Sequence, residues 1–430
     1  MIKVPQYAFY IIKTLKDAGF TAYLVGGCVR DHVMGRVPHD YDVATSAKPE
    51  QVMKLFASVI PTGIDHGTVT VRIKDSVQIE GGEPMLGAFG VEVTTYRGEG
   101  VYTDGRRPDD VVFLDSIEGD LARRDFSMNA MAYDPISDVL IDPFNGREDI
   151  RTQLVRCVGN PMERFGEDGL RPLRAIRFAT VLGFDFAQET YAAIKTPEIQ
   201  ATYAKVAIER VMEEFRKIMV AAEVSSGLGC LVDTGLMARI FPAVMLWEPA
   251  VRDQLFEEIS ETVQDYTIRF ARLVCGHQTQ VGSPPLLEQL KLPTQFINRV
   301  NHLSRFGVPV KDEDFSDAAL RKYAASIGRE NVLDALALQR GVVQSSSQEY
   351  LKRAASFEKA ALRLDQILTN KPPLTIGELA LNGNEIGEIV GKGPAIGKAL
   401  KTLLNAVLED PAVNTKEGLK SRLKSGVEIQ

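Results

Sequence analysis

The sequence has few cysteines and no long apolar run, and both absences restrict what the protein can be. Its four cysteines, Cys28, Cys157, Cys230 and Cys275, include no Cys-x-x-Cys pair, so neither a zinc site nor a disulfide framework is expected, and a reducing cytoplasmic location fits. No stretch of about 18 or more apolar residues occurs and no signal-peptide cleavage site is present, so no membrane association is predicted. The formal net charge of −7 counts little against nucleic-acid binding, since binding needs only a local basic surface.

The 430 residues allow roughly two to four domains, and the predicted elements change type along the chain. In the first third, strands are predicted at 22–25, 41–44, 69–73 and 91–96, and helices at 6–18, 29–34 and 49–56. Residues 74–90, rich in glycine and polar side chains, indicate a hairpin or loop insertion. Beyond about residue 150, helical spacing recurs at 170–182, 207–222, 253–263, 317–327 and 346–368. The sequence therefore predicts an α+β fold, with a mixed head followed by a helical remainder.

A strand-to-helix turn near the N-terminus is a candidate phosphate-binding site. Gly26 and Gly27 follow the first predicted strand, and two glycines let backbone N–H groups approach a phosphate at a helix N-terminus. Arg30 lies near the start of that helix and could grip phosphate oxygens. Most turns of this kind are only turns, so the assignment needs support from other residues.

Carboxylates farther along the chain supply that support. Asp40 and Asp42 are i and i+2 on a predicted strand, so both point to one face and can bind one or two hard cations. Glu92 stands between two valines on another predicted strand, where a charge is costly unless it serves a site. A third carboxylate would complete a site for two-metal phosphoryl or nucleotidyl transfer.

The motifs and their order resemble those of a known family. LVGGCVRD with HDYDVATSA, PTGIDHGTVTV, VEVTTYR, DGRRPDDVVF, RRDFSMNAMAYD and RFGEDGLRPLRAIRFA are similar to the motifs of class II tRNA nucleotidyltransferases. That family comprises the bacterial CCA-adding enzymes, the A-adding and CC-adding enzymes, and bacterial poly(A) polymerases. The motifs follow the family's order over residues 20–185, and weaker similarity continues to the C-terminus.

The resemblance implies a fold and a domain order. It implies a nucleotidyltransferase head of the DNA polymerase β type, a mixed sheet with helices, at residues 1–150. Three all-α domains would follow: a neck with the base-reading motif at 151–215, a body at 216–335, and a tail that binds tRNA at 336–430. In the tail, a Gly-x-Gly-Pro turn at 391–394 begins a predicted helix and could expose backbone N–H groups to an RNA phosphate.

The resemblance also implies roles for single residues. Asp40 and Asp42 would hold the catalytic magnesium ions (Mg2+), with Glu92 as the third carboxylate, and Gly26, Gly27 and Arg30 would face the triphosphate. Four residues match a motif linked to ribose and triphosphate recognition: Arg123, Arg124, Asp125 and Asn129. For Arg124 and Asp125 the alternative is an ordinary surface ion pair.

Residues 167–171, Glu-Asp-Gly-Leu-Arg, match the family's base-reading motif, and the chemistry can be derived from the side chains. At spacing i, i+3, Asp168 and Arg171 would share one helix face. The carboxylate accepts a hydrogen bond from the amine of cytosine or adenine, and the guanidinium donates to ring acceptors, whereas uracil and guanine place a carbonyl where the amine should be. The pair would then accept CTP and ATP and refuse UTP and GTP. The alternative is an ordinary helix salt bridge. Glu167 and Arg174 are expected as structural partners that orient the pair, and Arg174 is also a candidate nucleotide-binding residue.

These features predict a CCA-adding tRNA nucleotidyltransferase that uses CTP, ATP and the tRNA 3′ end, needs no nucleic-acid template and has no predicted protein partner. Residues 102–108 resemble the family's flexible loop, which assists the switch from C to A addition and is lacking in CC-adding enzymes. An A-adding enzyme or a poly(A) polymerase is the alternative within the family. A catalytically inactive tRNA-binding protein is the alternative outside enzymes.

Overall fold

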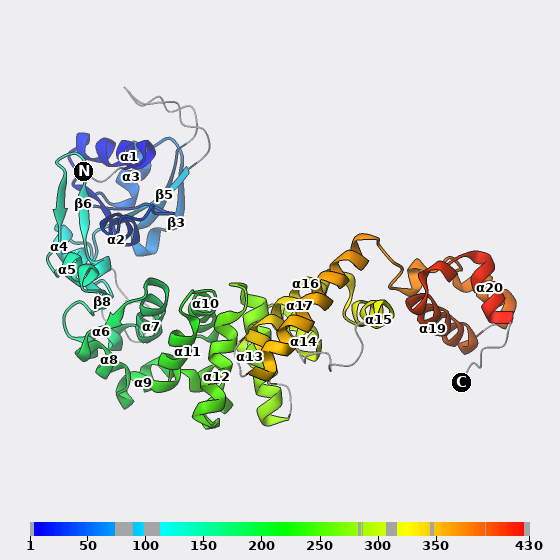
Figure 1. Cartoon of the computed structure of the whole chain (residues 1–430). Coiled ribbons are helices and arrows are strands. Elements are labelled where there is room, and N and C mark those ends of the chain that lie inside the picture. Colours follow the sequence, from blue (N-terminus) through cyan, green and yellow to red (C-terminus); the bar gives the residue numbers. More distant parts are fainter. Residues whose placement is uncertain are drawn as a thin grey trace. The chain divides into compact units, whose positions relative to one another are not determined.

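The structure is a computed structural model that describes residues 4–73, 89–98, 112–282, 285, 287–306, 316–344, 348–391 and 393–424. The chain divides into two compact units, the first formed by residues 1–218 with 226–245 and the second by 219–225 with 246–430 (Figure 1). The predicted loop at 102–108 lies outside the described residues, as does the predicted insertion at 74–90 except for its last two residues.

A mixed seven-stranded sheet forms the head of the first unit, as the sequence predicts. Its strand order is β3-β4-β5-β2-β1-β6-β7; β2 and β5 run parallel and the other neighbours antiparallel. The strands are β1 (Ala22–Val25), β2 (Asp42–Thr45), β3 (Val59–Gly63), β4 (Thr68–Ile73), β5 (Phe89–Thr95), β6 (Ala132–Asp134) and β7 (Val139–Ile141). β5 thus includes the last two residues of the predicted insertion. The register sets Asp42 beside Val25 of β1 and Glu92 of β5.

Side chains alternate between the two faces of this sheet, and each face has its own apolar core. Leu24 and Val43 pack with α1 (Gln6–Asp17) and α3 (Pro49–Leu55). Val25 and Ala44 instead join the core that includes Leu121 of α4 (Ile117–Ala122). Because side chains two residues apart share a face, Asp42 lies on the side of Ala44, away from α1.

The other helices of the first unit follow the sheet and carry much of the candidate site. They are α2 (Gly27–Val33), α5 (Gly146–Arg151), α6 (Pro161–Glu167), α7 (Arg171–Leu182), α8 (Gln188–Ile194), α9 (Pro197–Ala204), α10 (Ile208–Met219) and α11 (Val224–Asp233). A short parallel pair, β8 (Leu154–Val155) with β9 (Asp185–Phe186), interrupts the predicted all-helical stretch. α10 and α11 each contain a boundary between the two units.

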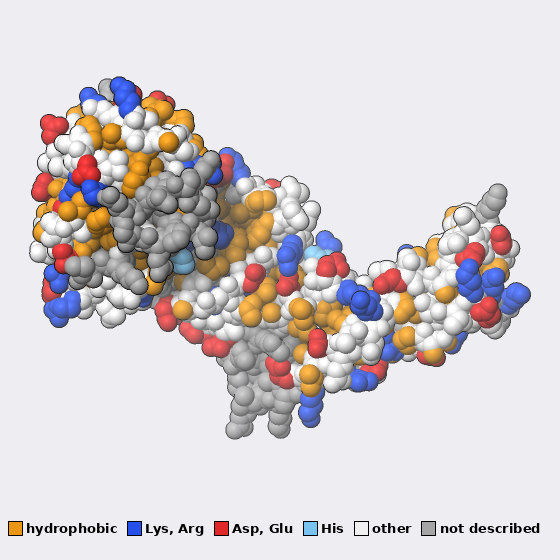
Figure 2. All heavy atoms as spheres, turned by 90° about the horizontal axis from the view of Figure 1, so that it is seen from above, with side chains coloured by type: hydrophobic (Ala, Val, Ile, Leu, Met, Phe, Trp, Pro, Cys, Tyr) orange, Lys and Arg blue, Asp and Glu red, His pale blue; other side chains and the backbone are white. Residues whose placement is uncertain are grey.

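The described part of the second unit is helical, in agreement with the sequence prediction. Its helices are α12 (Pro249–Glu261), α13 (Tyr266–Val281), α14 (Thr294–Phe306), α15 (Asp317–Ile327), α16 (Val332–Gln344), α17 (Gln348–Thr369), α18 (Gly383–Val390), α19 (Pro394–Glu409) and α20 (Lys416–Lys424). Across the described ranges, no helix combines the length and the apolar character needed to cross a membrane. On the face seen in Figure 2, lysines and arginines are interspersed with aspartates and glutamates, as the near balance of charges in the sequence suggests.

Candidate active site

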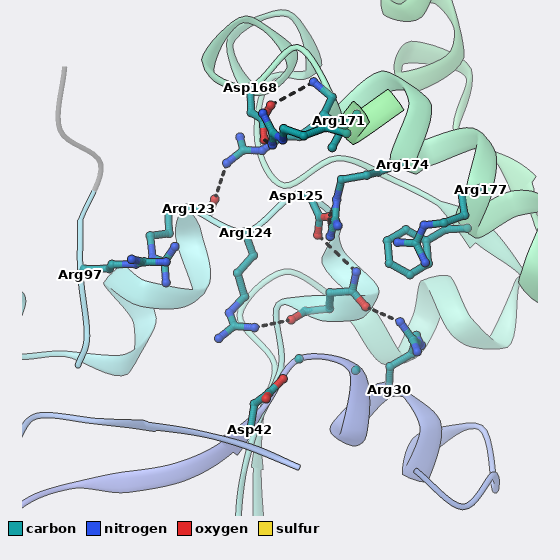
Figure 3. Close-up of a pocket in the computed structure, with 16 residues that line it drawn as sticks. Arg30, Asp42, Arg97, Arg123, Arg124, Asp125, Asp168, Arg171, Arg174 and Arg177 are labelled. Carbon is teal, nitrogen blue, oxygen red and sulfur yellow. Dashed lines mark hydrogen bonds and ion pairs between the residues drawn. The ribbon is translucent and has the colours of Figure 1, made fainter. Parts of the chain in front are cut away.

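A cavity of about 580 Å³ in the first unit is lined mainly by charged side chains (Figure 3). Its lining includes eight arginines and three aspartates, an excess of five formal positive charges. Such an excess suits a polyanion, because guanidiniums form strong charge-assisted hydrogen bonds with phosphate oxygens. The lining residues are Gly26, Gly27, Arg30, Asp42, Arg97, Arg123, Arg124, Asp125, Asn129, Asp168, Leu170, Arg171, Arg174, Arg177, Phe178 and Arg210.

The glycine turn predicted from the sequence forms part of this lining. Gly26 has φ 72° and ψ −134°, a backbone conformation that strongly favours glycine, and Gly27 begins α2. A Cβ on Gly26 would lie 2.9 Å from Nη1 of Arg124 and 3.9 Å from Oδ2 of Asp42. The backbone conformation therefore favours glycine at this position, and a side chain here would displace the guanidinium of Arg124.

Asp40 and Asp42 lie at the start of β2, and Glu92 lies in the middle of β5, opposite Asp42. Asp42 begins β2 in register with Glu92, and it is partly buried, whereas Asp40 and Glu92 are exposed. Burial, followed by the charge of Glu92 and then that of Asp40, raises the pKa of Asp42 to about 6, against the opposing effect of Arg124. Asp42 alone of the three lines the cavity.

This set of donors fits a hard divalent cation. All are carboxylate oxygens, and the raised pKa of Asp42 reports a repulsion that a cation would relieve. Within the described ranges, no three Asp, Glu, His or Cys side chains converge closely enough to form a metal site by themselves. A cation that is shared with nucleotide phosphates usually takes some of its ligands from them.

Two adjacent arginines at the cavity share one buried carboxylate. Asp120 is 1% exposed; its Oδ1 accepts from Nε and Nη2 of Arg123 at 3.0 and 2.8 Å, and its Oδ2 accepts from Nη2 of Arg124 at 3.1 Å. Burial raises the pKa of Asp120, but the two guanidiniums outweigh it and hold the pKa below its ordinary value. Because one carboxylate faces two guanidiniums, positive charge remains available for a ligand.

A chain of hydrogen bonds joins α2 to α7 (Figure 3). It runs through the segment RRDFSMNAMAYD at 123–134, the RRDF motif. Nη1 of Arg30 donates to Oδ1 of Asn129 at 2.8 Å, and Nδ2 of Asn129 donates to Oδ1 of Asp125 at 3.2 Å. Oδ2 of Asp125 accepts from Nε and Nη2 of Arg174 at 2.9 and 2.5 Å. Burial raises the pKa of Asp125, but Arg174 outweighs it and lowers the pKa to about 2. Asp125 is thus not half of an ion pair with Arg124.

Asp168 and Arg171 both line the cavity, but the prediction that they share one helix is wrong. α6 ends at Glu167, Asp168 has an extended backbone with φ −133° and ψ 108°, and α7 begins at Arg171. Two contacts keep residues 168–170 out of a helix. The Asp168 carboxylate accepts from the backbone N–H of Leu170 at 3.0 Å, and at Gly169 the chain packs so closely that a Cβ would lie 2.6 Å from the carbonyl oxygen of Thr202. Both residues therefore line the cavity from the junction between α6 and α7.

Asp168 and Arg171 are held by different partners. Oδ2 of Asp168 accepts from Nη2 of Arg210 at 3.0 Å. Arg171 donates to the carboxylate of Glu167, to the carbonyl oxygen of Arg164 at 2.9 Å and to that of Arg123 at 3.1 Å. Glu167 is thus a structural partner of Arg171, as expected, whereas Arg174 holds the carboxylate of Asp125 and the carboxylate of Asp168 is held by Arg210.

Sequence reasoning missed five of the lining side chains: Arg97, Leu170, Arg177, Phe178 and Arg210. Arg177 and Phe178 could have been found, because they continue the helical spacing of Arg171 and Arg174 along one side of α7. Arg210 lies 42 residues from Asp168 on another helix, and the local sequence gives no sign of the contact.

Three family models match successive parts of the chain. The poly A polymerase head domain matches residues 22–156. The RNA and SrmB-binding site of polymerase A matches residues 183–247, and the tRNA nucleotidyltransferase domain 2 matches residues 262–423. The models match parts of both compact units and leave residues 157–182 between the first two matches.

Full-length relatives and a solved structure resemble the chain from end to end. The CCA-adding enzyme of Limosilactobacillus fermentum is 34% identical, covering 95% of this chain and 94% of its own. That of Geobacillus kaustophilus is 35% identical, covering 96% and 95%. The crystal structure of the Bacillus stearothermophilus CCA-adding enzyme in complex with CTP superposes with a TM-score of 0.77 at 31% identity and covers 98% of both chains.

Proposed function

The chain belongs to the family of CCA-adding tRNA nucleotidyltransferases, and we propose from this that it adds C, C and A to the 3′ end of tRNA. Its substrates are CTP, ATP and tRNA, and the incoming base is selected by the protein without a nucleic-acid template. The observation that carries the proposal is the single cavity in which an excess of arginines, Asp42 and the Asp168–Arg171 turn come together. Triphosphate binding, metal binding and base reading are the three functions that one nucleotidyl transfer needs.

In this proposal the arginines and the glycine turn bind the triphosphate. The tRNA 3′-hydroxyl attacks the α-phosphate, and pyrophosphate leaves. Guanidiniums already held by carboxylates, such as Arg123 and Arg124 on Asp120, stabilise the charge that develops without reorganising, and the Gly26–Gly27 turn lets the triphosphate approach the backbone. Arg30, Asp125, Asn129 and Arg174 form one network and are proposed to act together.

We assign Mg2+ as the divalent cation and Asp40, Asp42 and Glu92 as the residues that would hold it. When bound, Mg2+ would favour deprotonation of the attacking hydroxyl and screen the charge of the triphosphate. The protein contributes the carboxylates, of which Asp42 and Glu92 are set side by side by the parallel pairing of β2 with β5. In this proposal the triphosphate begins near Gly26, to which the side chains of Arg124 and Asp42 both lie close.

Base reading is assigned to Asp168 and Arg171. A carboxylate offers about four acceptor positions, of which the Leu170 N–H and Arg210 use two, so Asp168 can still accept from the amine of cytosine or adenine. Contacts with Glu167, Arg164 and Arg123 hold the guanidinium of Arg171 at the cavity, and we assign this guanidinium to the ring acceptors of the base.

The remaining assignments concern the rest of the chain and its location. We propose a catalytic head at 1–150, a base-reading neck at 151–215, a body at 216–335 and a tRNA-binding tail at 336–430. A cytoplasmic location is proposed because all four cysteines are free thiols, as a reducing compartment requires.

Gly26→Ala tests the glycine turn, with Gly35→Ala as the matched control. Both glycines have φ 72°, but a Cβ on Gly35 would meet nothing within 4 Å. We expect each variant to lose about 1–2 kcal/mol of stability through the positive φ. Only Gly26→Ala should also raise the KM for CTP and ATP, because the new methyl displaces Arg124. Thermal unfolding and initial-rate kinetics measure the two effects, and equal KM values in both variants would remove Arg124 from the nucleotide site.

The experiment that tests the activity is incorporation of labelled CTP and ATP into tRNA that lacks its CCA end. We expect incorporation with Mg2+ and none after chelation of divalent cations. Binding of the tRNA without any incorporation would instead identify an inactive tRNA-binding protein.

A further inference from the structure

One aromatic ring in the cavity contacts three of its arginines. The guanidinium carbons of Arg177, Arg30 and Arg174 lie 3.7, 5.3 and 5.6 Å from the centroid of the Phe178 ring. Arg30 belongs to α2, and the other two belong to α7. Phe178 is 6% exposed, so these contacts are largely removed from water, where the attraction between a cation and a ring face is strongest.

Three guanidiniums this close together repel one another, so their arrangement has to be held. Each has a carboxylate partner: Asp31 at 2.7 Å from Arg30, Asp125 at 2.5 Å from Arg174, and Glu214 at 2.5 Å from Arg177. These carboxylates come from three separate segments of the chain, namely α2, the RRDF motif and α10. The ring of Phe178 is the group that contacts all three guanidiniums.

The orientation of the ring is itself fixed by a second aromatic residue. Phe126 is fully buried and meets Phe178 in an edge-on contact, with ring centroids 5.6 Å apart and an interplanar angle of 78°. Phe126 directly follows Asp125, and Phe178 follows Arg174 by one helical turn. Residues 125–126 therefore hold α7 at two successive turns, once by an ion pair and once by an aromatic contact.

We infer that Phe178 is a positioning residue of the nucleotide site: its ring holds Arg30, Arg174 and Arg177 in the arrangement that binds the triphosphate. This inference rests on the proposed function, which places the triphosphate in this cavity. Phe178 acts through the guanidiniums and takes no part in base reading, because Asp168 and Arg171 have other partners. Its effect should therefore be the same for CTP, for ATP and for a phosphate chain that has no base.

Progressive fluorination of the ring tests this role, because fluorine withdraws charge from the ring face while the side chain keeps its shape and apolar character. Phe178 is replaced in turn by mono-, di- and trifluorophenylalanine, and calorimetry measures the Kd of CTP, ATP and inorganic tripolyphosphate. We expect all three affinities to fall stepwise and in parallel, by about 3- to 30-fold over the series. The preference for C and A over U and G should not change, and thermal unfolding should show that each variant is still folded.

Phe56 is the matched control. It is 7% exposed, it has an edge-on aromatic neighbour in Tyr10 as Phe178 has in Phe126, and it does not line the cavity. The same fluorination at Phe56 should leave all affinities unchanged. Unchanged tripolyphosphate affinity in the Phe178 series, or a loss for CTP without a loss for tripolyphosphate, would overturn the inference.

The direct binding measurement also separates the two proposals. If the wild-type protein added no nucleotide to tRNA while tripolyphosphate binding still fell across the Phe178 series, the proposed function would fail and the role of Phe178 would stand. If C and A were added normally and tripolyphosphate affinity did not move, the proposed function would stand and the role of Phe178 would fail.

Discussion

Asp42→Asn should lower the rate of nucleotide addition by about 10³-fold or more, the largest effect expected of any single substitution here. Asp42 is the carboxylate that both lines the cavity and pairs in register with Glu92, so we propose it as the ligand that would lie between the metal and the triphosphate. The amide keeps the shape of the side chain but cannot replace a charged oxygen. Single-turnover addition of C to tRNA lacking its CCA end measures the rate.

The fall in the rate of nucleotide addition should occur without a fall in the stability of the fold. The charge of Asp42 is disfavoured by burial and by Glu92 and Asp40, so removing it relieves repulsion, and the melting temperature of Asp42→Asn without metal should be unchanged or higher. Asp40→Ala should behave in the same way. Asp17→Asn is the control, since this exposed residue of α1 pairs with Lys13 and should alter neither rate nor melting temperature. Near-normal activity of Asp42→Asn would remove the metal assignment.

Asp168→Ala should reduce the discrimination between C or A and U or G by about one to two decades, because each hydrogen bond to a charged group contributes roughly 1.5–3 kcal/mol. The substitution removes the acceptor for the base amine and the repulsion of a base carbonyl. It also frees Arg210, whose Nη2 donates to Asp168 in the intact protein and could then donate to the carbonyl of uracil or guanine. CTP and ATP should become poorer substrates, and UTP and GTP should become detectable ones.

Single-turnover incorporation of all four nucleotides on C-ended and CC-ended tRNA measures this effect. The double variant Asp168→Ala with Arg210→Ala should keep the loss of C and A addition but show less U and G addition than Asp168→Ala. Glu163→Ala, an exposed carboxylate on α6, is the control and should leave selectivity intact. Full selectivity of Asp168→Ala would mean that the base is read elsewhere and that Asp168 serves only its ion pair with Arg210.

The parts of the fold that follow from periodicity were predictable, and the short elements were not. β1, β2, β4 and β5 were predicted to within two residues, because alternating or continuous apolar side chains mark them. β6 and β7 have three residues each, too few to show a period. They form by pairing: β6 adds to the free edge of β1, and β7 then adds to β6. β3 was missed because none of its side chains is fully buried, so it carries no apolar pattern.

The candidate site shows the same division between local and distant information. The glycine turn and Asp42 could be found because the strand, the turn and the helix are contiguous in sequence. The argument for Glu92 was wrong in its energetics: Val91 and Val93 point into the core, but Glu92 lies exposed on the other face and pays no burial cost. The contacts that organise the arginines, such as Arg210 with Asp168 and Phe126 with Phe178, join residues 42 and 52 positions apart. No local pattern reports them.

The central claim is that one cavity adds C, C and A in that order and then stops. It is tested most directly with three tRNAs, ending at the discriminator base, at C and at CC, each incubated with CTP alone, ATP alone or both, followed by sequencing of the 3′ ends. The account predicts two additions from CTP alone on the first tRNA, one A from ATP alone on the third, and a CCA end on all three when both are present. Addition of A only, and only to the CC-ended tRNA, or extension into an A tail, would contradict it.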